Sequence, residues 1–349
     1  MFLEQIGADA RVRELFRALE TAGVELGRVC FAAREQYRIF FENGESEAAP
    51  SGTLRWDGAL PAVGDWVAAR RVNPEFALIE SVLPRRTKFS RRAAGDALSE
   101  QVIAANIDLA VIVCGLDHDF NLRRLERYLV LVKTSGAEPV VVLNKADLCL
   151  ETKQRAEAAA LVAAPAPLIV LSAHETVEPL RNLTRERTVA LLGSSGVGKS
   201  TIVNQLLNEE RQATGAVRTD DSRGRHTTTS RMLIPLPGGG AIIDNPGMRE
   251  LQLWATGESL GEVFQDVSVL AEGCRFGNCT HTTEPDCAVR AALESNDLDL
   301  SRWQSYRKLQ AESRYQQTEQ DVLAKADKKR KWKTIHKAMR RHPKDSRWT

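Results

Sequence analysis

A chain of 349 residues, 43% hydrophobic and 27% charged, has the composition of a soluble globular protein with room for two or three packed domains. It has no apolar run near the roughly 20 residues that a membrane-spanning helix needs, and its first residues include acidic ones where a secretory signal would be basic. We therefore expect a cytoplasmic protein that has no membrane partner.

The N-terminal part of the chain predicts a helix followed by a small β-barrel. Residues 1–26 form an amphipathic pattern, with Leu15, Phe16 and Leu19 on one side of a helix. Residues 27–92 contain short β-rich runs between turn formers, which indicates a barrel of the oligonucleotide/oligosaccharide-binding (OB) type; an SH3-like barrel gives the same pattern at this level. The runs are RVCFAA, QYRIFF, SGTLRW, DWVAAR and FALIESVL, with turn formers such as ENGES between them.

From residue 98 to 253 strands alternate with helices, the pattern of a mostly parallel sheet covered on both faces. The helix NLRRLERYLVLVKTSG has Asn121 as its expected N-cap and Gly136 near its end. The strands are LAVIVCG, PVVVLNKAD, PLIVLSA and TVALLG, followed by a glycine-rich turn and the helix KSTIVNQLL. Residues 254–349 read as helical and polar around a cysteine cluster. The sequence thus predicts an α/β fold with an N-terminal barrel and a C-terminal helical domain.

The glycine-rich turn fits the phosphate-loop pattern G-x-x-x-x-G-K-[ST] between a strand and a helix. Its glycines allow backbone N–H groups to surround phosphate oxygens, and the helix N-terminus adds positive potential. We expect Lys199 to reach the β- and γ-phosphates and the Ser200 hydroxyl to ligate Mg²⁺. A chance Gly/Ser loop is the alternative, and the flanking strand and helix argue against it. The predicted nucleotide-binding residues are Gly193, Ser194, Ser195, Gly196, Val197, Gly198, Lys199, Ser200 and Thr201.

A second motif, Asn144-Lys145-Ala146-Asp147, follows the strand PVVVL and predicts that the base is guanine. A carboxylate at Asp147 can accept from the ring N1–H and the 2-amino group of guanine. Adenine has neither donor and would leave the carboxylate desolvated and unpaired. We expect Lys145 to lie over the base plane and Asn144 to tie the loop together. Alone the motif is equally a polar helix N-cap, but beside a phosphate loop it indicates a GTP site.

Two shorter motifs complete the set. Ser172 and Ala173 follow the next strand, where GTPases place a backbone contact to the guanine oxygen. Asp244 and Gly247 open and close a D-x-x-G pattern; Asp244 is expected to hold Mg²⁺ through water and the Gly247 N–H to sense the γ-phosphate. The base-reading motif here precedes the phosphate loop, the reverse of ordinary GTPases. We therefore predict a circularly permuted P-loop GTPase domain, whose γ-phosphate-sensing segment leads directly into the next domain.

Between the phosphate loop and D-x-x-G lies RGRHTTTS, in the interval of the switch loop whose threonine ligates Mg²⁺. The candidates for that threonine are Thr227, Thr228 and Thr229. A polar loop without such a role is the alternative. Met248 stands where many GTPases have a water-orienting Gln, and a thioether cannot orient water. His226 is the candidate catalytic residue, because a neutral imidazole can accept a proton or a hydrogen bond near pH 7.

Three cysteines and one histidine follow within 14 residues, and they predict a zinc site with thiolate and imidazole ligands. The ligands are Cys274, Cys279, His281 and Cys287. A disulfide would use two of the cysteines and leave the third and the histidine unexplained, and the cytosol disfavours it. Four protein ligands leave no open position, so the role of the zinc is structural. The other cysteines, Cys30, Cys114 and Cys149, are expected to be buried thiols.

In order, FNLRRLERYL, NKAD, GSSGVGKST, RGRHTTTS, DNPGMRE and CRFGNCTHTTEPDCAV resemble the family of ribosome small subunit-dependent GTPase A, a bacterial assembly factor of the small ribosomal subunit. The resemblance covers nearly the whole chain. It implies an OB barrel, a permuted GTPase domain and a zinc domain. It also implies GTP as substrate, the small subunit and its rRNA as partner, and hydrolysis that the subunit stimulates. The family's proposed catalytic histidine falls on His226. We expect GTP or GDP, Mg²⁺ and one Zn²⁺ as ligands, and a monomer.

Two basic segments fit such a partner. PRRTKFSRR ends the barrel segment with five basic residues around Phe89. Residues 325–347 hold eleven Lys or Arg against two Asp, a net +9, so with +2 for the whole chain the remainder sums to −7. Such a tail is either a solvated helix or a contact with a polyanion. Two other functions stay open from the sequence: a nucleotide-switched RNA-binding module with negligible turnover, and an ATPase, against which Asp147 argues.

Overall fold

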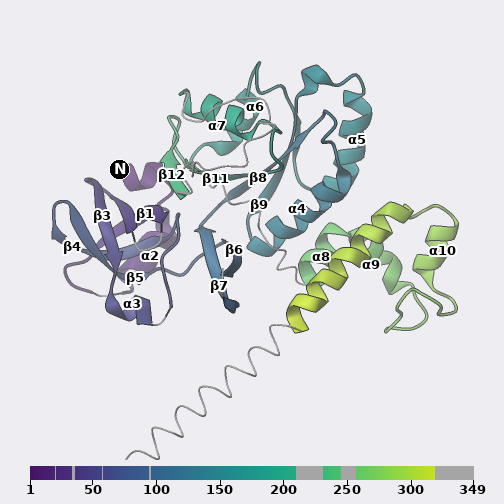
Figure 1. The fold of residues 1–349 in the computed structure, drawn as a ribbon, viewed down its shortest axis with the longest axis horizontal. Coiled ribbons are helices and arrows are strands. Elements are labelled where there is room, and N and C mark those ends of the chain that lie inside the picture. The colour runs from purple at the N-terminus through teal and green to yellow at the C-terminus, as the bar shows by residue number, and fades with distance from the viewer. Residues whose placement is uncertain are drawn as a thin grey trace, which may run out of the picture.

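Five strands near the N-terminus of the computed structural model close into a barrel (Figure 1). The structure describes residues 1–19, 21–33, 36–56, 58–93, 96–209, 231–244 and 257–318, and only the backbone of residues 92, 93 and 96–99. The strands are β1 (Glu25–Ala33), β2 (Gln36–Phe41), β3 (Gly44–Pro50), β4 (Trp66–Asn73) and β5 (Phe76–Val82). Because β1 pairs with both β2 and β4, and β3 pairs in parallel with β5, the barrel closes in the Greek-key manner of the OB type. The predicted barrel is confirmed.

One predicted strand of the barrel is wrong. The run SGTLRW forms helix α3 (Gly52–Trp56), and the third strand is β3, whose sequence GESEAAP overlaps the expected turn ENGES. Burial alternates along β3, but its buried residues include only small ones such as Ser46 and Ala48, so its hydrophobic alternation is weak. In α3, Leu54 packs into the barrel core while the Trp56 side chain is 91% exposed.

The N-terminal segment forms two short helices instead of the single helix expected over residues 1–26. Helix α1 (Phe2–Gln5) and helix α2 (Ala10–Arg17) are separated by Gly7, whose φ of 100° lies in the left-handed region that favours glycine. The Asp9 carboxylate caps α2 by accepting a hydrogen bond from the backbone N–H of Val12 at 2.9 Å.

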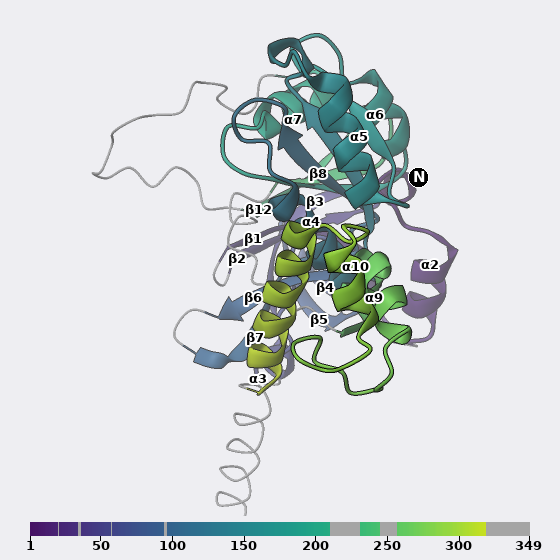
Figure 2. The same cartoon turned by 90° about the vertical axis from the view of Figure 1, so that its right-hand side faces the viewer.

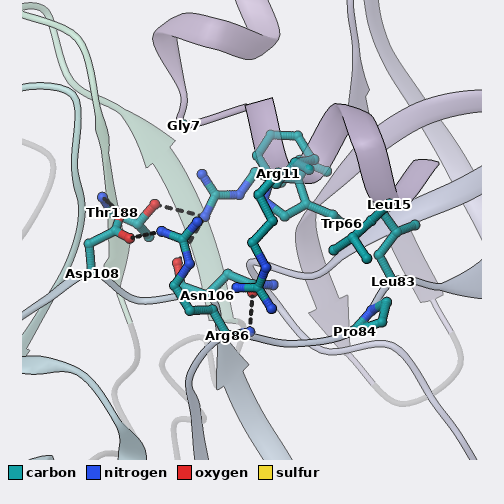
Figure 3. Close-up of a pocket in the computed structure, with 12 residues that line it drawn as sticks. Gly7, Arg11, Leu15, Trp66, Leu83, Pro84, Arg86, Asn106, Asp108 and Thr188 are labelled. Carbon is teal, nitrogen blue, oxygen red and sulfur yellow. Dashed lines mark hydrogen bonds and ion pairs between the residues drawn. The ribbon is translucent and has the colours of Figure 1, made fainter. Parts of the chain in front are cut away.

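A buried arginine on β1 joins this N-terminal segment to the barrel and to the larger sheet. Arg28 donates to the backbone oxygens of Ile6 and Asn106 and, at 2.7 Å, to the Thr188 hydroxyl. Its guanidinium lies 4.7 Å from the centre of the Trp66 ring. Figure 3 shows Trp66, Asn106 and Thr188 among the residues that line the pocket at this junction. Burial lowers the pKa of Arg28 to about 10, so it remains a cation at neutral pH, held by neutral oxygens from three other parts of the chain.

The basic segment PRRTKFSRR supplies a strand that the sequence did not predict. Strands β6 (Lys88–Ala93) and β7 (Asp96–Ala105) form a separate antiparallel pair. Phe89 is only 2% exposed and belongs to the core, and Lys88 pairs with Glu100 at 2.7 Å. The aromatic ring of this segment therefore serves packing, and Arg85 and Arg86 pair with Asp65 and Asp9 within the chain.

The larger sheet continues from the barrel without a break. Its strands are β8 (Leu109–Gly115), β9 (Glu138–Asn144), β10 (Leu168–Val170), β11 (Thr188–Leu192), β12 (Arg231–Pro235) and β13 (Ala241–Asp244). They lie in the order β10-β9-β8-β11-β13-β12, all parallel except β12. Strand β12 then pairs antiparallel with β1 of the barrel, with Met232 opposite Phe31. The predicted mostly parallel sheet is confirmed.

Helices cover both faces of this sheet (Figures 1 and 2). Helices α4 (Leu122–Ser135) and α5 (Thr152–Ala163) pack on one face, and α6 (Glu178–Thr184) and α7 (Lys199–Leu207) pack on the other. The Asn121 side chain caps α4, and Gly136 ends it with a φ of 82°, as the sequence predicts. Helix α6 was not among the expected elements.

The C-terminal module, here residues 257–318, contains α8 (Gly257–Val263), α9 (Gln265–Glu272), α10 (Ala288–Glu294) and a helix over residues 300–318. Its buried Phe264 and Trp303 join the same core cluster as α4 and α5, so the module packs on that side of the sheet. The predicted C-terminal helical domain is confirmed. No helix in the described parts of the chain has the length and apolar composition to cross a bilayer.

Candidate nucleotide and metal sites

The phosphate-loop residues lie between the buried end of β11 and the first turn of α7. Gly193, Gly196 and Gly198 have φ values of 144°, 78° and 97°, which side chains rarely adopt. A Cβ on Gly198 would come within 2.1 Å of Asn144 Nδ2, and one on Gly193 within 2.3 Å of the Val113 backbone oxygen. The turn therefore requires glycine at these positions, as a loop whose backbone approaches phosphate does.

The functional side chains of this loop lie at the start of α7. The Lys199 ammonium donates to the backbone oxygens of Gly193 at 2.8 Å and Ser194 at 2.5 Å, so it is folded back onto the loop. Ser200 and Thr201 occupy the first turn of the helix and are half-buried. Val197 is fully buried, and Ser195 and Gly196 are exposed at the turn. A cation and a hydroxyl thus stand at a helix N-terminus, where polyphosphate and Mg²⁺ bind in P-loop proteins.

The base-reading motif begins where β9 ends. Lys145 has a φ of 67°, and residues 146–148 form one short 3₁₀ turn in which the Asp147 side chain is exposed. The Lys145 ammonium pairs with the Asp117 carboxylate at 2.7 Å. Across from this turn, Ser172 is buried and its hydroxyl has no hydrogen-bond partner among the described residues. An exposed carboxylate, a lysine and an unsatisfied hydroxyl therefore lie on two consecutive strand ends of the sheet.

One buried amide connects the three motifs. Asn144 is 2% exposed; its Nδ2 donates to the Val197 backbone oxygen and its Oδ1 accepts from the Ala173 N–H, both at 2.8 Å. The structure therefore brings together the base-reading turn, the Ser-Ala segment and the phosphate loop, although they are separated along the chain. The Ala173 N–H is engaged by Asn144 here.

The third motif is described only at its first residue. Asp244 ends β13, which runs parallel to β11 with Ile243 opposite Ala190, so its carboxylate leaves the sheet at the same edge as the phosphate loop. The remaining predicted residues of the switch segments lie outside the described residues: Gly247, Met248, His226, Thr227, Thr228 and Thr229.

The predicted zinc ligands meet in the C-terminal module. The ligand atoms of Cys274, Cys279, His281 and Cys287 all lie within 4.8 Å of one another. The Cys274 and Cys287 sulfurs are 3.8 Å apart, and His281 Nδ1 is 3.5 Å and 3.4 Å from them. Tetrahedral zinc, with bonds of about 2.3 Å to sulfur and about 2.0 Å to nitrogen, gives edges of about 3.8 Å and about 3.5 Å. The four residues therefore have the donors and spacing to hold such a metal, and none of the six cysteines is in a disulfide.

A residue that the sequence analysis did not single out shapes the zinc loop. The Glu284 carboxylate accepts from the Thr280 hydroxyl at 2.5 Å, and from the backbone N–H groups of Thr280, Thr282 and Thr283 at 2.8 to 3.1 Å. These bonds, the Thr280 hydroxyl first, hold the pKa of Glu284 well below its usual range. The pattern T-x-T-x-E contains suitable donors, but only the fold shows that they converge on one carboxylate.

Comparison with known proteins agrees with this geometry. The family model described as RsgA GTPase matches residues 82–254. A protein of Opitutus terrae named small ribosomal subunit biogenesis GTPase RsgA is 45% identical over the whole of both chains. A Lactiplantibacillus plantarum protein named small ribosomal subunit biogenesis GTPase RsgA 2 is 46% identical over 84% of this chain and 85% of its own. The chain belongs to the RsgA GTPase family. It is a GTP hydrolase, as that family is, and it takes GTP or GDP with Mg²⁺.

Solved structures confirm the permuted fold of this RsgA GTPase family member. The crystal structure of YjeQ from Thermotoga maritima has a TM-score of 0.62 and 25% identity, over 83% of this chain and 98% of its own. That of YloQ, titled a circularly permuted GTPase, also has a TM-score of 0.62, at 23% identity over 84% and 96% of the two chains. An ABC transporter model also matches residues 181–342, a range that contains the phosphate loop but leaves out Asp147. The relatives described above, which are named as GTPases and align over 84% to 100% of this chain, decide between the two.

Proposed function

We propose that this GTPase acts in the biogenesis of the small ribosomal subunit: it binds a late precursor of the subunit through its rRNA, and the subunit stimulates hydrolysis. The observation that carries the proposal is the relative named for that role, 45% identical over the full length of both chains. In this proposal residues 27–92 contact RNA, residues 98–253 hydrolyse GTP and residues 254–349 hold zinc and the basic tail. Residues 1–26 join the barrel to the sheet, and the protein works as a cytoplasmic monomer.

The nucleotide roles follow from the geometry. Asp147 would accept from the guanine N1–H and 2-amino group, Lys145 would lie along the base, and Ser172 and Ala173 would border the guanine oxygen. The phosphate-loop residues would surround the phosphates, with the Lys199 ammonium moving from the loop oxygens to the β- and γ-phosphates. These residues are the glycines Gly193, Gly196 and Gly198 and the intervening and following Ser194, Ser195, Val197, Ser200 and Thr201.

The residues at the phosphate end also fit Mg²⁺. Ser200 would ligate the ion directly and Asp244 through water, since both lie at the edge of the sheet where β11 and β13 end. When bound, the ion neutralises charge that builds up on the phosphate oxygens. Gly247 and one of Thr227, Thr228 and Thr229 would respond to the γ-phosphate; the sequence carries that part of the proposal.

The C-terminal module would hold one structural Zn²⁺ through Cys274, Cys279, His281 and Cys287. The donors support this, because the three distances among Cys274, His281 and Cys287 match the edges of a tetrahedral zinc site, and four protein ligands leave no position for a substrate.

His226 would position the attacking water. Since Met248 cannot do so, an imidazole in the switch segment is the group left by the sequence to accept a hydrogen bond from that water. We predict that His226→Ala loses most subunit-stimulated turnover, on the order of 10²-fold or more, while its affinity for GTP changes little. Turnover measured at saturating small subunit is the deciding quantity. A near-normal value would remove His226 from catalysis and place the water-positioning group on the ribosome.

Basic groups supply the RNA contact in this proposal. They include those of PRRTKFSRR and the tail beyond residue 325, with Trp56 of α3 as an exposed ring on which a base can stack. Because each neutralised phosphate releases counterions, binding should weaken steeply with salt. Co-sedimentation with purified subunits in the presence of a non-hydrolysable GTP analogue tests the proposal. We expect binding to small subunits, a flatter salt dependence after deletion of residues 325–349, and no binding to large subunits; equal binding to both subunits would contradict it.

A further inference from the structure

A loop outside the recognised motifs touches both halves of the nucleotide site. The bracket loop, here residues 116–121, connects β8 to α4 and follows Gly115. A Cβ at Gly115 would come within 2.6 Å of Asp117 Oδ1, so the glycine lets the loop fold back on itself. From α5, the Arg155 guanidinium donates to the backbone oxygens of Leu116 at 2.8 Å and Asp117 at 3.1 Å, which fixes the loop in place.

The first half of the bracket loop meets the base-reading motif. Asp117 Oδ2 accepts from the Lys145 ammonium at 2.7 Å, and Asp117 Oδ1 accepts from the Asp119 N–H at 3.1 Å. The two charged side chains are 14% and 23% exposed, so the pair is largely shielded from solvent. Lys145 is thereby held in one direction before any base arrives.

The second half meets the phosphate loop through a closed triad of hydrogen bonds. The Ser194 hydroxyl donates to Asp119 Oδ2 at 2.5 Å. The Arg124 guanidinium donates to Asp119 Oδ1 at 2.6 Å and to the Ser194 hydroxyl oxygen, Oγ, at 2.5 Å. Hydrogen bonds to ionised groups are about twice as strong as neutral ones. Ser194 is also the residue whose backbone oxygen accepts from the Lys199 ammonium, so the triad fixes a carbonyl that positions the phosphate-loop lysine.

Arg124 of the triad belongs to helix α4, and the C-terminal module contacts the neighbouring residues of that helix. Arg123, beside Arg124, donates to the Ser301 hydroxyl at 2.5 Å and pairs with Asp299 at 3.2 Å. One turn along the helix from Arg123, fully buried Glu126 pairs with Arg302 of the module at 2.9 Å. The position of the triad is therefore set by the same short stretch of α4 that carries the module.

We propose that Asp119 and Arg124 are positioning residues of the phosphate loop, and that the C-terminal module anchors them through Glu126 of α4. Movement of the module against α4 then changes the affinity for nucleotide phosphates while the base site is left unchanged. The inference requires only that the chain binds GTP, and it stands whether or not the small subunit is the partner.

The test is a thermodynamic cycle of nucleotide affinity on Ser194→Ala, Arg124→Gln and the double variant. We expect each single change to weaken GDP binding on the order of tenfold and the double variant to be no weaker than the singles, because all three break one triad. Binding of GMP, which lacks the β-phosphate, and the preference for GTP over ITP should not change. A merely structural defect would weaken GMP and GDP together.

The anchor is tested by the double variant Glu126→Gln/Arg302→Gln, which removes both charges of the buried pair together. Asp266, the other carboxylate that Arg302 contacts, is 43% exposed and can be solvated by water in the variant. It should weaken GDP binding with GMP binding retained, and adding Arg124→Gln should cause no further loss. Arg127→Ala is the matched control, because its 2.6 Å pair with Glu312 joins the same helix to the same module on a residue outside the triad; its GDP affinity should equal wild type. With folding checked by circular dichroism, wild-type GDP affinity in the triad variants, or strictly additive losses, would overturn the proposal.

Discussion

Asp147 is exposed at the first turn after β9, beside a phosphate loop that is tied to it by Asn144. An exposed carboxylate near that loop can be satisfied by water until guanine replaces the water with its N1–H and 2-amino donors. Adenine replaces the water with nothing, and the cost of an unpaired carboxylate is enough to select the base.

Asp147→Asn should therefore weaken GTP binding and favour xanthosine triphosphate, because an amide can donate to the 2-oxo group of xanthine. Competition binding with the two nucleotides measures the switch, and Asp119→Asn, at the phosphate end, is the control that should leave the preference for guanine intact. GTP affinity equal to wild type in Asp147→Asn would take the motif out of the site.

A second residue-scale prediction concerns Asp117. Burial opposes ionisation of its carboxylate, but the hydrogen bonds from Lys145 and the Asp119 N–H prevail, so its pKa is lowered from 3.8. A lowered pKa means that the charged pair is present at every pH above about 4 and is lost only as pH falls through the folded-state value. Asp117→Asn should weaken GTP binding several-fold, and the ratio to wild type should stay constant from pH 5.5 to 8. A ratio that rises or falls across that range would show that another group controls Lys145.

Residue identities within short motifs could be read from the sequence, because glycine, lysine and aspartate at fixed spacing follow from phosphate and guanine chemistry. Asp117, Asp119 and Arg124 could not, since their roles depend on partners 28 to 75 positions away along the chain. The role of Glu284 could not be predicted either. Its hydrogen-bond partners are close in sequence, but only the shape of the folded loop brings them to one carboxylate.

Among the elements, the loop that carries the four proposed zinc ligands contacts the C-terminal module through one of those ligands. Its His281 ring lies edge-on to Trp303, with centroids 5.6 Å apart, and Trp303 stacks on Tyr306 of the helix over residues 300–318. His281 is thus in direct contact with the core of the C-terminal module, so a metal bound at the four proposed ligands would contribute to the folding of the module.

Cys279→Ala should lower zinc content from one per chain to a small fraction and lower the melting temperature, because one thiolate of a closed site is lost. Cys149→Ala is the control and should keep the metal, because Cys149 is a free cysteine directly after the base-reading turn and is not one of the four clustered residues. Full zinc retention in Cys279→Ala, measured by metal analysis, would mean that the ligands lie elsewhere.

The boundaries of helices and strands could be predicted where the side-chain pattern was strong. Helix α4 has both caps and a clear apolar face, and its start and end were predicted. Strand β3 buries small side chains, and helix α3 is only one turn long. Residue propensity therefore predicted a strand at α3 and a turn at the start of β3. Strand β7 and helix α6 were not anticipated either. Tertiary pairing decides such short elements.

At the scale of the molecule, the barrel and the nucleotide-binding sheet are one hydrogen-bonded structure. Strand β12 joins them, with β13 on one side and β1 on the other, and β12 begins directly after residues 210–230. Arg28 adds a second connection, from β1 to the start of β11. Arg231, the first residue after this interval, therefore lies in a strand that is hydrogen-bonded directly to the proposed RNA-binding barrel, opposite Ala32.

Turnover of GTP by the full-length protein, with and without purified small ribosomal subunits, tests the proposed function as a whole. We predict an increase on the order of tenfold or more with small subunits, since groups that order a switch and stabilise charge contribute at least that much in phosphoryl transfer. Large subunits should cause no increase. Identical turnover with small subunits, with large subunits and with neither would contradict the proposed function.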